Sequence, residues 1–175
     1  MKFIYRCLLT INSIILLLVV YLIKEKIYLR LNIPLSMHIS YMLYIVLTVL
    51  MSGICLWMSR FLGNETIEGG ITDIEAANNS YLPSYLGYFF VALSISDWST
   101  LIWIGILILI FSFFSQTLYF NPMFFLFGYK FYNVTVDTGM KLFVISKKNI
   151  TSIKDLKFTK LKRINNYTFI DKEVS

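Results

Sequence analysis

The sequence is poor in the residues that most often carry catalysis or bind metals. Its 175 residues include one histidine, His38, and two cysteines, Cys7 and Cys55. One histidine provides neither a pair of metal ligands nor a catalytic triad, and both cysteines lie within apolar runs, where a disulfide or a metal site is not expected. The sequence also lacks a glycine-rich phosphate loop, a serine nucleophile elbow and a two-acid protease motif. We therefore predict no catalytic residue, no metal site and no cofactor, and a protein that is not an enzyme.

Charged residues are also scarce, at 15% of the chain, whereas 57% of the residues are hydrophobic. A soluble domain of this length does not need so much apolar surface, so lipid is the expected solvent. The fold class predicted from four uncharged runs is an α-helical membrane protein, with transmembrane helices near residues 7–23, 39–58, 79–96 and 99–120. The third run is the shortest and needs residues 79–82 to reach spanning length. A cleaved signal peptide is not expected, because no small-x-small cleavage site follows the first run.

Positive charge gathers in the tail, residues 130–175, which contains ten of the sixteen lysine and arginine residues and four acidic residues. Basic segments beside membrane spans usually remain in the cytoplasm. With four spans, both termini and the loop 59–78 are then predicted to be cytoplasmic. Lys24, Lys26 and Arg30 fall on the opposite side in this arrangement, but the basic residues of the tail outnumber them.

The tail has the alternation of polar and apolar residues that is typical of β-strands. Residues 130–136 and 140–146 alternate with period two. Between them, Asp137–Thr138–Gly139 suits a three-residue hairpin loop with glycine in the left-handed position. Similar runs flank Asn165–Asn166, so we predict a small cytoplasmic antiparallel sheet after a membrane domain of residues 1–129. A sheet of this size is only marginally stable alone, and it is expected to pack against the membrane, another copy or a partner.

The segment between the last span and the tail contains no flexible linker. Asn121–Pro122 predict an end or a kink of the last helix near the membrane surface. Gly128 and Tyr129 then lead directly into the first strand at Lys130. We interpret Asn121, Pro122, Gly128 and Tyr129 as residues that couple movement of the last span to the tail. The alternative, that they form only a compact join, is equally consistent with the sequence.

Small polar residues within the spans predict contacts between helices. Ser112, Ser115 and Gln116 lie at three- and four-residue spacing on one side of the last span. Such groups usually face other helices, where each hydrogen bond is worth about 0.6 kcal/mol. They favour a bundle and a homo-oligomer. No ionisable residue lies in the middle of a span, so an ion or proton pathway is not indicated, and Asp97 is interpreted as the N-cap of the last span.

Two charged sets are candidates for binding a partner. They are Lys147, Lys148, Lys157, Lys160, Lys162 and Arg163 in the tail, and Glu65, Glu68, Asp73 and Glu75 in the cytoplasmic loop. Anionic membrane lipid is the nearest partner for the basic set, at about 1 kcal/mol per basic residue. Simple retention of the tail in the cytoplasm explains that set equally well, and direct nucleic-acid binding is not expected. The loop residues Thr72–Glu75 also match a capping box and predict a helix of one or two turns.

One stretch of the chain resembles a known family. The stretch FNPMFFLFGYKFYNVTVDTGMKLFVISKK, preceded by four hydrophobic segments, is similar to KwaA, the membrane protein of the Kiwa antiphage system. The resemblance implies a bacterial inner-membrane protein with four spans that forms a homo-oligomer, a tetramer. It also implies that the protein senses phage attack at the envelope and works with a cytoplasmic DNA-binding effector, KwaB.

These observations leave two functions to compare. The first is an antiphage sensor and scaffold that oligomerises in the inner membrane and recruits or controls a cytoplasmic effector. The alternative is a pore-forming effector that depolarises the cell. A membrane enzyme is disfavoured by the missing catalytic groups.

Overall fold

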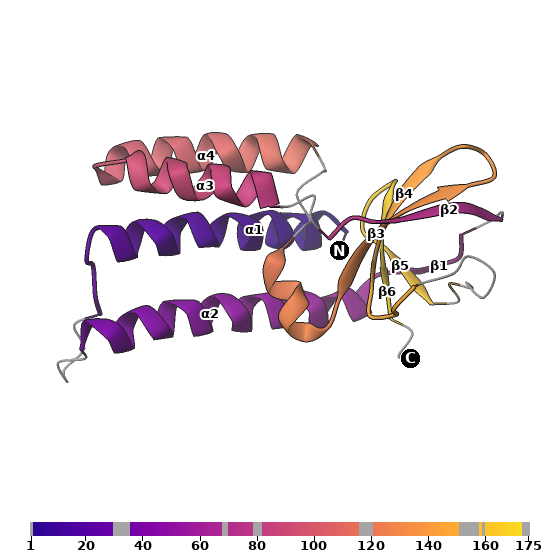
Figure 1. Cartoon of the computed structure of the whole chain (residues 1–175), viewed down its shortest axis with the longest axis horizontal. Helices are drawn as coiled ribbons and strands as arrows, with labels where there is room; N and C mark the ends of the chain where they lie inside the picture. Colours follow the sequence, from indigo (N-terminus) through magenta and orange to yellow (C-terminus); the bar gives the residue numbers. More distant parts are fainter. Residues whose placement is uncertain are drawn as a thin grey trace.

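The computed structural model describes residues 2–29, 36–67, 70–78, 82–115, 121–150, 158 and 160–172. Figure 1 shows helices at one end of the molecule and a β-sheet at the other. The helices are α1 (Lys2–Lys24), α2 (Met37–Met58), α3 (Leu82–Ser94) and α4 (Trp98–Ser115), with short 3₁₀ helices η1 (Ser59–Phe61) and η2 (Pro122–Phe127). The strands are β1 (Asn64–Glu65), β2 (Ile71–Ala76), β3 (Lys130–Val136), β4 (Lys141–Ser146), β5 (Leu161–Arg163) and β6 (Thr168–Asp171).

Helix α1 is the centre of the bundle and packs against α2, α3 and α4. In Figure 1 it lies between α2 and the hairpin of α3 and α4. At the end far from the sheet, the rings of Tyr21 and Trp98 meet edge to face at 5.1 Å. Asp97 accepts hydrogen bonds there from the Thr100 N–H at 2.8 Å and the Thr100 hydroxyl at 2.7 Å. The prediction of Asp97 as the N-cap of the last predicted span is therefore confirmed.

The helix lengths support only part of the four-span prediction. Among the described residues, α1 with 23 residues and the segment Met37–Phe61 with 25 are long and apolar enough to cross a membrane. Helix α3 has 13 residues and α4 has 18, or about 20 and 27 Å at 1.5 Å per residue. A hydrocarbon core is about 30 Å thick. The structure therefore shows two candidate spans, and crossing by α3 and α4 stays a prediction.

The sheet has six strands in the order β1-β5-β6-β4-β3-β2. The predicted hairpin is confirmed, because β3 and β4 pair antiparallel around a turn in which Gly139 has φ +79°. The prediction of a wholly antiparallel sheet is wrong at one place, since β4 and β6 pair in parallel. The connection between them leaves β4 and returns through β5, which lies on the far side of β6.

The predicted helix at Thr72–Glu75 is wrong, because these residues belong to strand β2. Ile71 and Ile74 pack against the apolar core on one face of the sheet. The Thr72 hydroxyl donates to the Thr135 carbonyl at 3.1 Å instead of capping a helix. Pairing with β3 and burial of the two isoleucines therefore outweigh the local helix signal.

Both edge strands of the sheet come from the segment between α2 and α3. β1 pairs with β5 and β2 pairs with β3, so this predicted loop encloses the strands of the tail from both sides. One connection, Leu62–Gly63, runs from η1 to β1, and another, Gly128–Tyr129, runs from η2 to β3. The sheet is thus a joint product of the loop and the tail, attached to the helices by short connections.

The two faces of the sheet bury different sets of side chains. One face packs against the ends of the helices through a core that includes Phe131, Ile145 and Ile170 of the sheet and Leu9 and Phe124 of the helical part. The other face carries its own core, in which Val134, Val144 and Leu161 are fully buried. Alternation along each strand produces this division. The first core makes the sheet continuous with the helical bundle.

Candidate functional site at the helix–sheet junction

Helix η2 is a short element that enters the helical bundle beside α2 before the chain turns into the sheet (Figure 1). Asn121 caps it, with Oδ1 accepting the Met123 N–H at 2.9 Å. Pro122 follows at its start, where the missing N–H costs nothing. Gly128 ends it with φ +78°, a left-handed conformation that favours glycine. The predicted break at Asn121–Pro122 thus begins a new helix, and Gly128 is the residue that stops it.

Three buried polar side chains hold η2 against α1 and α2. We call Asn12, Ser52 and Asn121 the polar triad. The Ser52 Oγ accepts from Asn12 Nδ2 at 3.1 Å and from Asn121 Nδ2 at 3.2 Å. Asn121 Nδ2 also lies 3.4 Å from the Asn12 carbonyl oxygen, and all three residues are at most 1% exposed. Because a buried amide without a partner is costly, the triad fixes the relative positions of three chain segments.

The sequence indicated part of this triad. Asn12 and Ser52 stand out as polar residues within apolar runs, and such residues are expected to face other helices. Asn121 stands out only through its pairing with Pro122. Their mutual contact could not be predicted, because 40 residues separate Asn12 from Ser52 and 69 separate Ser52 from Asn121.

Gly53 allows η2 to approach α2 closely. A Cβ atom placed on Gly53 would lie 3.1 Å from Cζ of Phe127, closer than most carbon contacts. Phe127 itself packs against the core beneath the sheet. Gly53 and Ser52 are neighbours on α2, so one holds η2 by hydrogen bonds and the other admits its aromatic ring.

Two lysines in or beside the sheet bind backbone carbonyls at the carboxyl end of α2 and just beyond η1. Lys172 Nζ donates to the Leu56 carbonyl at 2.8 Å and lies 3.1 Å from the Tyr129 hydroxyl oxygen. Lys162 Nζ donates to the Leu62 carbonyl at 2.7 Å. The last carbonyls of a helix have no partner within the helix, and cations there are favourable. These contacts attach the end of β6 to the end of α2, and β5 to Leu62, the residue that follows η1.

The environment of Lys172 changes its acidity. Burial, followed by the nearby positive charges of Arg60, Lys147 and Lys162, lowers the pKa of Lys172 to about 8. Burial also raises the pKa of Tyr129, and the ammonium of Lys147 lies 5.0 Å from the centre of its ring. Tyr129, one of the four predicted coupling residues, is therefore the point where two lysines of the sheet meet the junction.

The predicted basic set is divided between different contacts. Lys147 and Lys162 lie at the junction, as described, and Lys148 lies 4.0 Å from the buried Asp171. Arg163 pairs with Glu65 at 3.1 Å. Lys160 is exposed, and Lys157 lies outside the described residues.

The predicted acidic set is divided as well. Glu65 binds Arg163 and also lies 3.7 Å from Lys2, so it joins β1, β5 and α1. Asp73 and Glu75 are exposed on the edge strand β2, and Glu68 lies outside the described residues. Among the described residues of this set, the exposed pair on β2 is therefore the part that remains accessible to a partner.

The predicted helix-contact residues can be placed only in part. Ser112 is 2% exposed within the chain, which leaves its hydroxyl no free surface for a second copy. Gln116 and the side chain of Ser115 lie outside what the structure describes. Across the described residues, no group of three or more histidine, cysteine, aspartate or glutamate side chains could hold a metal ion.

A family model described as anti-phage protein KwaA matches residues 5–170, which include the helices, the junction and the sheet. No curated protein and no solved structure matches the chain significantly.

Proposed function

The chain belongs to the KwaA family of anti-phage proteins, and from this premise we propose that it is a sensor and scaffold in the bacterial inner membrane. Four helices cross the membrane, and both termini and the sheet lie in the cytoplasm. The protein forms a homo-oligomer, a tetramer. Its sheet holds a cytoplasmic DNA-binding effector, KwaB, and releases or activates it when phage attack disturbs the membrane.

Exposed apolar side chains support the membrane setting. Soluble monomers rarely expose large contiguous apolar patches. The exposed large hydrophobic side chains on two helices include Met42, Ile45, Val46, Leu47, Leu50, Ile54 and Trp57 of α2 and Ile102, Trp103, Ile106, Leu107, Ile110, Phe111 and Phe114 of α4. Lipid or a second copy would cover both rows.

The position of the α3–α4 turn supports crossing by all four helices. The Lys24 ammonium donates to the Ile95 carbonyl, and Tyr21 packs on Trp98. The turn between α3 and α4 therefore reaches the same end of the bundle as the carboxyl end of α1. A bilayer can thin locally around helices that are somewhat short.

The helix–sheet junction is the observation that carries the proposal. A flexible tether would separate the sheet from movements of the helices. Here the polar triad joins η2 to α1 and α2, and Lys172 joins the sheet to α2. A tilt or shift of α2 relative to α1 would therefore move the sheet and any effector on it.

The distribution of polar groups disfavours the pore. A water-filled pore needs polar groups that face its axis. Thr10, Asn12, Ser13, Thr48 and Ser52 are all buried within the chain, and the exposed rows of α2 and α4 are apolar. Liposomes that contain the purified protein should therefore show no ion flux above that of empty liposomes, and a steady flux would favour the pore.

Co-purification with the effector tests the scaffold. We expect the full chain to retain KwaB through the exposed face of the sheet, and reversal of both charges on β2 (Asp73→Lys with Glu75→Lys) to weaken that retention. The same charge reversal at the exposed Lys160 (Lys160→Glu) tests whether the basic set also contributes to the retention of KwaB. If no effector is retained by the parent chain, the scaffold is wrong. A reporter fused at Ser175 that is active only in the periplasm would overturn the topology.

A further inference from the structure

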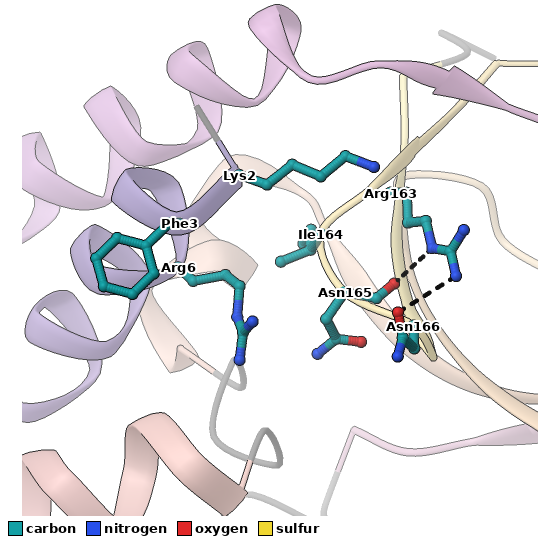
Figure 2. Close-up of a pocket in the computed structure, with 7 residues that line it drawn as sticks. All are labelled: Lys2, Phe3, Arg6, Arg163, Ile164, Asn165 and Asn166. Carbon is teal, nitrogen blue, oxygen red and sulfur yellow. Dashed lines mark hydrogen bonds between the residues drawn. The ribbon is translucent and has the colours of Figure 1, made fainter.

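A pocket of about 280 Å³ lies where the first turns of α1 meet the turn between β5 and β6 (Figure 2). Its lining is Lys2, Phe3 and Arg6 of α1 and Arg163, Ile164, Asn165 and Asn166 of the sheet. The pocket therefore joins the start of the first predicted span to the part of the tail that the sequence analysis marked as basic.

The pocket carries an excess of positive charge. Lys2, Arg6 and Arg163 all line it, and none of its lining residues is acidic. The carboxylate of Glu65 lies outside this lining and is shared between Arg163 at 3.1 Å and Lys2 at 3.7 Å. One carboxylate shared by Lys2 and Arg163 leaves a net positive charge at that pair. The amino end of α1 adds to the positive potential through its backbone N–H groups.

Hydrogen bonds within the protein hold the polar groups of the pocket in place before any ligand binds. Arg163 donates from Nε to the Asn165 carbonyl at 3.1 Å and from an Nη to Asn166 Oδ1 at 3.4 Å. Asn165 Oδ1 accepts the N–H groups of Tyr167 at 2.8 Å and Thr168 at 2.7 Å. The amide oxygen of Asn165 is thus occupied, and Figure 2 shows its amide nitrogen on the side that faces Arg6. That nitrogen and the cations are all donors, which suits an anion.

Apolar aromatic surface begins at the edge of the pocket. The guanidinium of Arg6 lies 5.2 Å from the ring centre of Phe113, which also contacts Phe3 at 5.5 Å. Phe3 is 65% exposed and the adjacent Phe114 is 75% exposed. A free phosphate ion has no apolar part that could pack against this surface. A molecule with an anionic head and an apolar chain matches both parts.

We propose that this pocket binds the headgroup phosphate of an anionic phospholipid from the cytoplasmic leaflet. The phosphate lies among Lys2, Arg6 and Arg163, and the acyl chains follow the exposed rings of Phe3 and Phe114. This assignment rests on the membrane setting of the proposed function. A bound lipid would contact both α1 and the β5–β6 turn. A disturbance of the membrane that moves this lipid would then move the sheet directly.

Native mass spectrometry of the full chain in detergent tests the site. Phosphatidylglycerol and phosphatidylcholine are titrated separately, and inorganic phosphate is added as a competitor. We expect retention of phosphatidylglycerol over phosphatidylcholine, and a loss of affinity of about fivefold for each charge removed in Lys2→Gln and Arg6→Gln. The same neutral change at the exposed Lys141 (Lys141→Gln), which lies outside both the basic set and the pocket, should leave binding unchanged. Lys2→Gln alters an exposed side chain and keeps the test valid if Arg6→Gln does not fold.

Three results would overturn the site: equal retention of both lipids, unchanged retention by the Lys2 and Arg6 variants, or full displacement of lipid by inorganic phosphate, which would indicate a soluble anion. Because binding is measured in detergent, it does not depend on topology or on the effector. A failure of the proposed function would instead appear as a wrong reporter orientation or as loss of the effector with lipid binding intact.

Discussion

The amide of Asn121 donates to the hydroxyl of Ser52 at 3.2 Å inside the protein. The two residues lie 69 positions apart in the chain, one at the start of η2 and the other within α2. This single hydrogen bond relates the element that leads into the sheet to a candidate membrane span. Asn12 of α1 completes the contact through its own bond to Ser52 at 3.1 Å.

Removing the Ser52 hydroxyl should destabilise the junction. Ser52→Ala leaves the buried amides of Asn12 and Asn121 without their shared acceptor, and a buried donor left unpaired costs about 1–3 kcal/mol. The expected result is a lower melting temperature of the purified protein in detergent. Ser94→Ala is a suitable control, because Ser94 is exposed and its hydroxyl donates to the Phe90 carbonyl of its own helix. Equal melting of the two variants would show that the triad contributes no stability.

A side chain at Gly53 should push η2 away from α2. In Gly53→Ala the new methyl group meets the ring of Phe127, and crowding of a packed site costs about 1–3 kcal/mol. Shortening the ring in Phe127→Leu should remove most of that clash. The double variant should therefore lose less stability than the two single losses added together. Simple additivity in a double-mutant cycle would contradict the contact.

Lys172 should make stability depend on pH. Its pKa is about 8 in the folded protein and 10.5 ordinarily, so the unfolded chain binds more protons than the folded one between these values. The contribution of Lys172 to the free energy of unfolding should therefore rise as pH increases from about 8 towards 10.5. Lys172→Met lacks this titration. The melting temperature of the parent minus that of the variant should increase across the window, and a constant difference would refute the shift.

Neutralising Glu65 should strengthen anion binding and barely affect stability. Glu65 pairs with Arg163 and Lys2 at partly exposed positions, and such pairs contribute about 1 kcal/mol or less. Glu65→Gln releases both cations toward the pocket. We expect tighter retention of phosphatidylglycerol in native mass spectrometry, with a nearly unchanged melting temperature. Weaker retention would mean that Glu65 positions the cations rather than competing with the lipid.

Local patterns in the sequence were sufficient for part of the fold. The β3–β4 hairpin was predictable because its period-two runs and the Asp137–Gly139 turn adjoin in the chain. Strands β1 and β2 were not, because β1 has two residues and β2 carries the competing capping-box signal. Both depend on pairing with strands that lie far along the sequence.

The candidate site, like the sheet, was predictable only where its signal is local in the sequence. Sequence reasoning placed Asn121, Gly128 and Tyr129 at a join, because asparagine–proline and glycine mark turns whatever surrounds them. It could not supply Ser52, Gly53 or Lys172 as their partners, since those contacts form only when distant segments pack. It also assigned Glu65 to a docking surface, whereas the fold pairs it with cations of two other elements.

The tail is not a separable module, and this affects how its role is tested. Residues 130–175 supply β3, β4, β5 and β6, so deleting them leaves β1 and β2 without partners. Loss of the effector after such a deletion would report only an unfolded sheet. An insertion that keeps every residue is the sharper experiment.

The coupling of helices to sheet is tested most directly by lengthening the connection after Tyr129 with several glycine and serine residues. The pairings of β1 with β5 and of β2 with β3 should keep the sheet folded, so the effector should still co-purify. The same insertion after Thr138, in the β3–β4 turn, is the matched control. In cells challenged with phage, the account predicts protection by the parent and by the Thr138 insertion, and loss of protection with the Tyr129 insertion. Full protection by the Tyr129 insertion, with the effector bound, would contradict transmission through the junction.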